Sequence, residues 1–112
     1  MAIKVSSEVT NGIAKVVLEG ELDAAAAGEF RGVVEQVSAD KPKRLVLMMD
    51  DLTFMASAGL RVLVFAKQKL GANVDIYVVG AHDAVLETIE MTGFQQSVIM
   101  LDAYDAAEIE NL

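Results

Sequence analysis

The chain has 112 residues, 54% of them hydrophobic, which is enough for one domain with a buried core. Seventeen acidic residues against nine basic ones give a formal net charge of -8, which argues against unassisted binding to nucleic acid or to an anionic membrane. There is no cysteine, so disulfides and thiol chemistry are excluded, in agreement with a cytoplasmic location. Neither a secretory signal nor an apolar run of about 18 residues is present, so no membrane-spanning helix is expected.

The beginning of the chain predicts a β-hairpin. Apolar and polar residues alternate from Ile3 to Val9 and again from Ile13 to Glu19, as expected of two strands. Asn11-Gly12 between them is a strong signal for a tight turn, so the strands should pair antiparallel. Gly20 to Asp23 then form a loop, and Asp23 is placed to cap the helix that follows.

A helix and a buried strand come next. The apolar stripe of the helix, at three- and four-residue spacing, consists of Phe30, Val33, Val34 and Val37. The polar segment from Ser38 to Lys43 contains the only proline, Pro42, so the helix should stop there. Leu45 to Met49 is a continuous apolar run that suits a parallel strand covered on both faces. Asp50 and Asp51 should end this strand.

The rest of the chain continues the alternation of helices and strands. The expected elements are a helix from Ser57 to Leu70, a strand over 74–79, a short helix over 85–89, a strand over 98–100 and a last helix capped by Asp102. Together they predict an α/β fold in a single domain over residues 1–112. Its sheet should be mostly parallel and five-stranded, opened by an antiparallel hairpin and accompanied by about four helices.

Several polar side chains should gather at one end of this sheet. The loops that follow parallel strands meet at the same end, where ligands and partners usually bind. The residues concerned are Asp23, Asp50, Asp51, Ser57, His82 and Asp83. Most have a simpler interpretation as helix caps, strand terminators or solvated loop residues. Ser57 has two possible roles. Its hydroxyl can cap the free N–H groups at the start of a helix. A phosphate attached to that hydroxyl would face the same N–H groups and the positive end of the helix dipole.

Known catalytic and metal-binding motifs are missing. There is no P-loop and no G-x-S-x-G elbow, and a nucleophilic serine would lack a nearby base because the only histidine, His82, lies in a different loop. Asp50 and Asp51 are similar to the paired acids of receiver domains, but they follow the third strand and not the first, and no lysine follows the last strand. We therefore expect no enzyme activity, no cofactor and no metal.

The order and spacing of these segments resemble the STAS family, named after sulfate transporters and anti-sigma factor antagonists. The matching features are the hairpin, G-E-L-D at 20–23, the apolar strand ending in Asp50, S-A-G-L at 57–60, Val79-Gly80 and the D-A-Y-D-A-A segment near the end. The resemblance covers nearly the whole length. It implies a stand-alone bacterial anti-sigma factor antagonist, which sequesters an anti-sigma factor that is also a serine kinase and so frees a sigma factor. Phosphorylation of Ser57 would break the complex, and a serine phosphatase would restore it.

We expect a partner-binding surface around Ser57, the position of the family's phosphorylated serine. It comprises Asp23, Asp50, Met55, Ala56, Ser57, Ala58, Gly59, Val62 and Phe65. Val62 and Phe65 point away from the sheet-facing stripe of their helix, so they either contact the partner or lie under another helix. The family's usual D-S-S-G-L reads A-S-A-G-L here, which leaves Ser57 as the only hydroxyl in the motif.

Two alternatives remain open from the sequence. The chain could be a STAS adaptor or structural subunit, in a stress-sensing assembly or a lipid-transport complex, with Ser57 acting only as a cap. A weaker alternative is a small-ligand or nucleotide-binding domain that uses the loops at the end of the sheet. A monomer or weak dimer is expected, with no direct contact to nucleic acid or membrane.

Overall fold

The computed structural model describes residues 3–111, and its sheet has five strands in chain order, β1-β2-β3-β4-β5. The hairpin pairs β1 (Lys4–Thr10) with β2 (Ile13–Leu22) antiparallel. Positive φ angles at Asn11 and Gly12, 54° and 81°, give the tight turn that such a hairpin needs. The strands β3 (Arg44–Met55), β4 (Asp75–Val79) and β5 (Ile99–Leu101) continue the sheet in parallel. The predicted α/β fold is confirmed.

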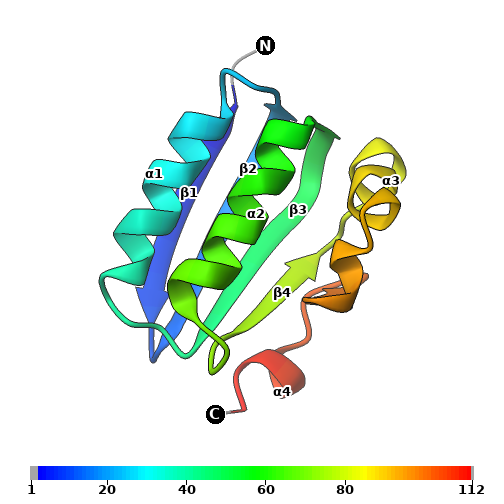
Figure 1. Ribbon diagram of the computed structural model, residues 1–112. Coiled ribbons are helices and arrows are strands. Elements are labelled where there is room, and N and C mark those ends of the chain that lie inside the picture. Colours follow the sequence, from blue (N-terminus) through cyan, green and yellow to red (C-terminus); the bar gives the residue numbers. More distant parts are fainter. Residues whose placement is uncertain (1–2, 112) are drawn as a thin grey trace.

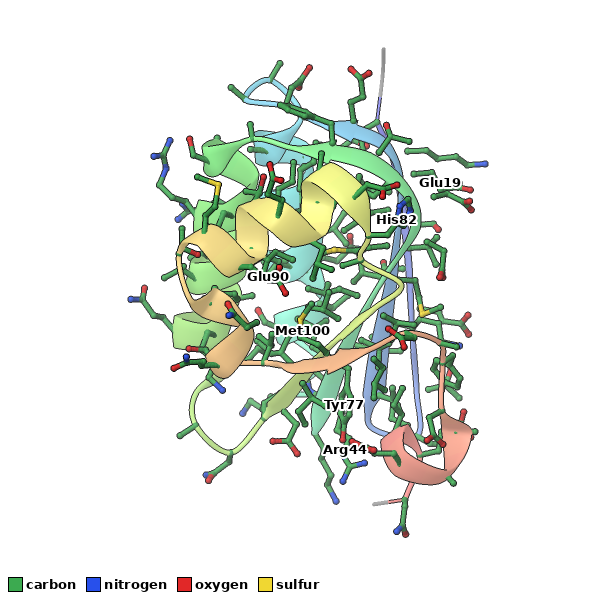
Figure 2. The ribbon with its side chains drawn as sticks, turned by 90° about the vertical axis from the view of Figure 1, so that its right-hand side faces the viewer. Glu19, Arg44, Tyr77, His82, Glu90 and Met100 are labelled. Carbon is green, nitrogen blue, oxygen red and sulfur yellow. The ribbon has the colours of Figure 1, made fainter. Side chains whose placement is uncertain are left out.

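The helices cover the two faces of the sheet unequally. In Figure 1, α1 (Ala27–Ser38) and α2 (Ser57–Leu70) lie side by side over one face, and α3 (Asp83–Met91) follows beyond β4. A single turn of 3-10 helix, η1 (Phe94–Gln96), leads from α3 to β5. The short α4 (Ala106–Ile109) lies on the opposite face, as the side view in Figure 2 shows. No helix within residues 3–111 is long and apolar enough to cross a membrane.

The core follows from the two-residue period of the strands. On the helix side, Leu45, Leu47 and Met49 of β3 are completely buried with the apolar stripes of α1, α2 and α3. On the other side, a smaller cluster forms around Val46, Tyr77 and Ile109. The apolar run of β3 is therefore buried on both faces, as the sequence predicts.

Arg44 holds α4 against the second face of the sheet. Its guanidinium donates hydrogen bonds to the carbonyl oxygens of Glu108 and Ile109, the latter at 2.8 Å, and it lies 5.8 Å from the centre of the Tyr77 ring. Figure 2 shows Arg44 and Tyr77 next to each other at this end of the sheet. Ile109 is completely buried as a result.

Three predicted boundaries are wrong. Gly20 to Leu22 do not form a loop, because β2 continues to Leu22 in pairing with β3. Asp50 and Asp51 do not end β3, which continues to Met55. Both acidic side chains are exposed, while Leu52 and Met55 beyond them are buried and hold the strand in register with β2 across two irregularities of the pairing. An acid therefore does not end a strand when its side chain reaches water. In α4 the cap is Asp105, whose carboxylate accepts from the Glu108 N–H at 3.3 Å, and not Asp102.

Candidate functional site

The junction between β3 and α2 lies at the end of the sheet where Leu22 pairs with Met55. The Ala56 N–H donates to the Leu22 carbonyl oxygen at 2.8 Å, which fixes this junction to the last residue of β2. Asp23 follows Leu22 directly, so Asp23 and Ser57 lie on neighbouring chain segments. The Asp23 carboxylate accepts from the Ala26 N–H at 2.9 Å and stabilises the turn that leads into α1. The prediction that Asp23 caps α1 is therefore wrong, because the N-cap is Ala26 and no side chain caps that helix, while Asp23 holds the turn before it.

Ser57 is the first residue of α2 and not its cap. The N-cap position belongs to Ala56, whose backbone is extended at φ -79° and ψ 166°, and no side chain caps this helix start. The prediction that Ser57 caps α2 is therefore wrong. The Ser57 side chain is exposed, and its hydroxyl makes no hydrogen bond to any residue in the range 3–111.

Two backbone donors at the start of α2 are free. The N–H groups of Gly59 and Leu60 donate to the Ala56 carbonyl oxygen at 2.9 and 3.1 Å. Those of Ser57 and Ala58 make no backbone hydrogen bond in the described part of the chain, as usual for the first turn of a helix. The first turn contains no acidic residue. A hydroxyl at the positive end of a helix, beside unpaired N–H groups, is a position where an attached phosphate is well accommodated.

Gly59 lets the start of α2 lie close to the end of β2. A Cβ atom at this position would lie 2.7 Å from Leu22 Cγ and 3.2 Å from Met55 Cγ. Gly59, Met55 and Leu22 are all buried. Gly59 and Met55 therefore support Ser57 from below, and neither belongs to a surface that a partner can reach.

The structure corrects the expected exposure of Val62. This side chain is 5% exposed and belongs to the main core, because α1 packs along α2 on this side. Phe65 is half-buried, and the Arg31 guanidinium of α1 stacks over its ring, 4.0 Å from the centre. The open interpretation that another helix covers these two residues is the one that the structure supports.

Apolar side chains are exposed on the other side of α2. The large exposed hydrophobic residues of the described chain are Phe54, Val64 and Met91, with exposed fractions of 43%, 38% and 80%. Val64 follows Ser57 by two helical turns and so lies on the same face of α2. We call Ser57, Val64 and Met91 together the α2–α3 face.

A hydrogen bond places α3 beside the β3–α2 junction. The Thr88 hydroxyl lies within reach of two carbonyl oxygens, Met55 at 3.2 Å and Ala84 at 3.0 Å. Met91 follows Thr88 by three residues, so it lies on the same side of α3 about one turn further on. The exposed apolar side chains of Val64 and Met91 were not predicted as part of this site. The spacing of Ser57 and Val64 was a usable signal, whereas the position of Met91 depends on how α3 packs.

Asp50 and His82 form a separate group. About 17 Å of extended strand joins Asp50 to Met55 and keeps this group apart from Ser57 along β3. The Asp50 carboxylate lies over Gly80, where a Cβ atom would be 1.9 Å from its Oδ1. His82 Nε2 is 2.9 Å from the Asp50 carbonyl oxygen and Nδ1 is 3.0 Å from Asp83 Oδ2, at the start of α3 (Figure 2). These contacts connect β3 to the β4–α3 loop.

The hydrogen bonds of His82 change its titration. The contact with Asp83 raises the pKa of His82, and the Asp50 carbonyl oxygen raises it further. The imidazolium form can donate from both ring nitrogens, which explains the direction of this shift. No group of three or more histidine, aspartate or glutamate residues within 3–111 is arranged to hold a metal ion.

A family model assigns the fold. The model described as STAS domain matches residues 4–107. The chain belongs to the STAS family. This STAS domain is 29% identical over 87 residues to the anti-sigma-F factor antagonist RsfB of Mycobacterium tuberculosis. The aligned residues make up 78% of this chain and 71% of that protein. It is 22% identical over 111 residues to the anti-sigma-B factor antagonist of Staphylococcus aureus, covering 98% and 100% of the two chains.

Solved structures agree with this assignment. An anti-sigma factor antagonist from Mycobacterium paratuberculosis superimposes on the STAS domain with a TM-score of 0.89 at 26% identity, covering 98% of this chain and 96% of that one. The phosphorylated form of the Bacillus cell fate determinant SpoIIAA has the same fold, with a TM-score of 0.72 at 20% identity and 97% coverage of both chains. The resemblance to STAS proteins of the anti-sigma factor antagonist type is confirmed.

Proposed function

We propose that this STAS domain is an anti-sigma factor antagonist that binds an anti-sigma factor through the end of the molecule around Ser57 and thereby frees a sigma factor. The observation that carries the proposal is the exposed, unpaired Ser57 hydroxyl at the start of α2. Relatives named anti-sigma factor antagonists support it. The function is binding, and no catalytic step is assigned to this chain.

The proposed switch is phosphorylation of Ser57 by the anti-sigma factor acting as a serine kinase. A phosphate adds about 1.5 to 2 negative charges at the point where the partner docks. Within the domain, the free N–H groups of Ser57 and Ala58 and the helix dipole offset this charge by about 0.3–1 kcal/mol. Inside an interface the phosphate would lose its water without a prepared partner, which costs far more. A phosphatase that removes the phosphate would restore binding.

The proposed contact surface is the α2–α3 face, together with Phe54 at the end of β3. Exposed apolar side chains beside a modification site suit a protein interface, and Met91 is 80% exposed. Asp23, Ala56 and Ala58 surround Ser57 at its edge and remain part of the proposal. Val62, Met55 and Gly59 support this surface from inside the domain.

Incubation with ATP and the candidate serine kinases of the same genome tests the proposal directly. We expect one phosphate per chain, mapped to Ser57 by mass spectrometry, and none in the S57A variant. An S97A variant removes another exposed serine and serves as the matched control, which should be phosphorylated normally. Modification of Ser6, Ser7, Ser38 or Ser97 in place of Ser57 would contradict the proposed site.

A second candidate function is a STAS adaptor in a larger assembly. The observation that favours it is Ala56, which stands where the usual family motif has an acid before the acceptor serine. An adaptor would co-purify with its assembly at unchanged yield when S57A and S57D variants replace the normal chain. An anti-sigma factor antagonist would instead lose its partner only in the S57D variant.

A further inference from the structure

A basic groove lies at the end of the molecule opposite Ser57. It has a volume of about 430 Å³ and runs between the loop that joins α1 to β3 and the C-terminal end of α2. Its charged walls are Lys41, Lys43 and Lys69, and its apolar lining is Pro42, Leu70 and Val74. In Figure 1 these segments meet at the lower end of α2, whereas the helix begins at its upper end, with Ser57 as its first residue. The 14 residues of α2 separate the two sites by about 20 Å.

The groove concentrates positive charge on an acidic protein. Three of the nine basic residues line it, although the net charge of the chain is -8. Among residues 3–111, no carboxylate lies within 4.0 Å of any of these three ammonium groups. Asp40 and Asp75 are close in sequence, but neither lines the groove.

The helix ends nearby do not cancel this charge. Both α1 and α2 end at the groove, and the dipole of each helix places about half a negative charge there. Two such ends amount to about one negative charge against three ammonium groups. Among the charges that line the groove itself, an excess of about two positive charges remains, which is more than neutralisation of the helix ends requires.

The loop that carries two of the lysines is held in place. The Lys43 N–H donates to the Gly12 carbonyl oxygen at 2.7 Å, and the Lys41 N–H donates to the Ser38 carbonyl oxygen at 3.0 Å. Lys41 has a φ of 49°, in the left-handed region that disfavours most side chains and favours glycine. A lysine that lines the groove therefore occupies a backbone position where glycine would be less strained.

We propose that this groove binds a small anion carrying two or more phosphate groups. Lysine ammonium groups on facing walls suit phosphates as point charges, and the apolar lining suits a less polar part of the same molecule. The volume lies in the range of small-molecule sites, about 300–1,000 Å³. A long polyanion such as nucleic acid would be repelled by the acidic remainder of the surface. Because the site is far from Ser57, it is independent of the proposed phosphorylation switch.

Titration of the full chain with inorganic pyrophosphate and with ATP, at constant ionic strength, tests the site by amide NMR. We expect saturable shifts confined to residues 38–43 and 69–74. The affinity of the K41Q/K43Q/K69Q variant should be lower by at least roughly tenfold, since each ammonium contributes a charge-assisted contact. The K4Q/K15Q/R61Q variant has the same change in net charge away from the groove, and it should bind like the unmodified protein.

Three results would overturn the proposal. Equal weakening in both triple variants would mean that only net charge matters. Shifts that do not saturate, or that spread over the whole surface, would mean unspecific screening. Binding of a peptide of ten glutamates to the groove without binding of pyrophosphate or ATP would assign the surface to an acidic protein partner. The circular dichroism spectrum of each variant checks that it is folded.

Discussion

The backbone N–H of Ala56 donates to the carbonyl oxygen of Leu22 at 2.8 Å, so the residue before Ser57 is tied to the last residue of β2. The side chain of Leu22 lies under Gly59, where any Cβ would be 2.7 Å away. The start of α2 is thus held to β2 by a hydrogen bond and by packing. This arrangement keeps the Ser57 hydroxyl exposed on a rigid support.

Replacing Gly59 with alanine should destabilise the domain by about 1–3 kcal/mol, because the added methyl group must displace the completely buried Leu22. Urea unfolding followed by circular dichroism measures this change. The matched control is G32A in α1, where no atom lies within 4 Å of the new Cβ. That variant should be more stable by about 0.4–1 kcal/mol, because alanine restricts the unfolded chain. Equal stability of the two variants would show that Gly59 is not a packing requirement.

Val64 and Met91 should matter for binding and not for stability. V64Q and M91Q each change an exposed side chain, so the free energy of unfolding should move by less than about 0.5 kcal/mol while affinity for the anti-sigma factor falls. V62A removes methyl groups from the core and should cost about 1–3 kcal/mol with little direct effect on affinity. Calorimetric titration with the partner and urea unfolding separate the two effects. Unchanged affinity of both V64Q and M91Q would remove α3 from the proposed interface.

The helix start offers a stabilising substitution. Ala56 has the extended backbone of an N-cap residue but no side-chain acceptor. A56D should therefore raise the free energy of unfolding by about 0.5–2 kcal/mol, whereas S57A should change it by less than about 0.5 kcal/mol because Ser57 caps nothing. Thermal unfolding of both variants, measured in parallel with the unmodified chain, is sufficient. A loss of stability in S57A larger than the gain in A56D would show that Ser57 supports the helix after all.

The elements themselves were predictable because local rules decide them. Residues within a few positions of one another decide the Asn11-Gly12 turn, the alternation along β2 and the three- and four-residue spacing in α1 and α2. The run from Leu45 to Met49 predicted burial on both faces, and the two hydrophobic clusters confirm it.

The errors occurred where distant parts of the chain decide the outcome. Which side of α2 is covered depends on where α1 packs, so the pattern around Val62 could not distinguish a surface from a buried contact. The length of β3 depends on its pairing with β2 beyond Asp51, which no local signal reports. The prediction of Ser57 as a cap was displaced by one residue because Ala56 fills the cap position without any polar side chain.

His82 should titrate above its ordinary pKa of about 6.5. Its contacts with Asp83 and the Asp50 carbonyl oxygen raise the pKa in the folded state, so the imidazolium form is favoured by folding. The stabilisation is fully present below the unfolded pKa and is lost as the pH rises through the folded one. Because His82 is the only histidine, its ring signals in NMR give the midpoint without ambiguity. The D83N variant should lower that midpoint, and an unchanged midpoint would mean that the contact is not formed in solution.

Phosphorylation of Ser57 should act locally. The nearest acids along β3 are Asp50 and Asp51. The end of the strand separates them from Ser57 by more than the screening length, which is about 10 Å at 0.1 M salt. The helix dipole and two free N–H groups offset part of the added charge, so the melting temperature should change little. Amide NMR of the phosphorylated protein should show shifts around residues 55–60 and the loop at Asp23, with the rest of the spectrum preserved. Affinity for the anti-sigma factor should fall at least tenfold, because the phosphate cannot be desolvated in the interface. Widespread spectral change together with a shifted melting temperature would instead indicate a conformational switch, and the electrostatic mechanism would be wrong.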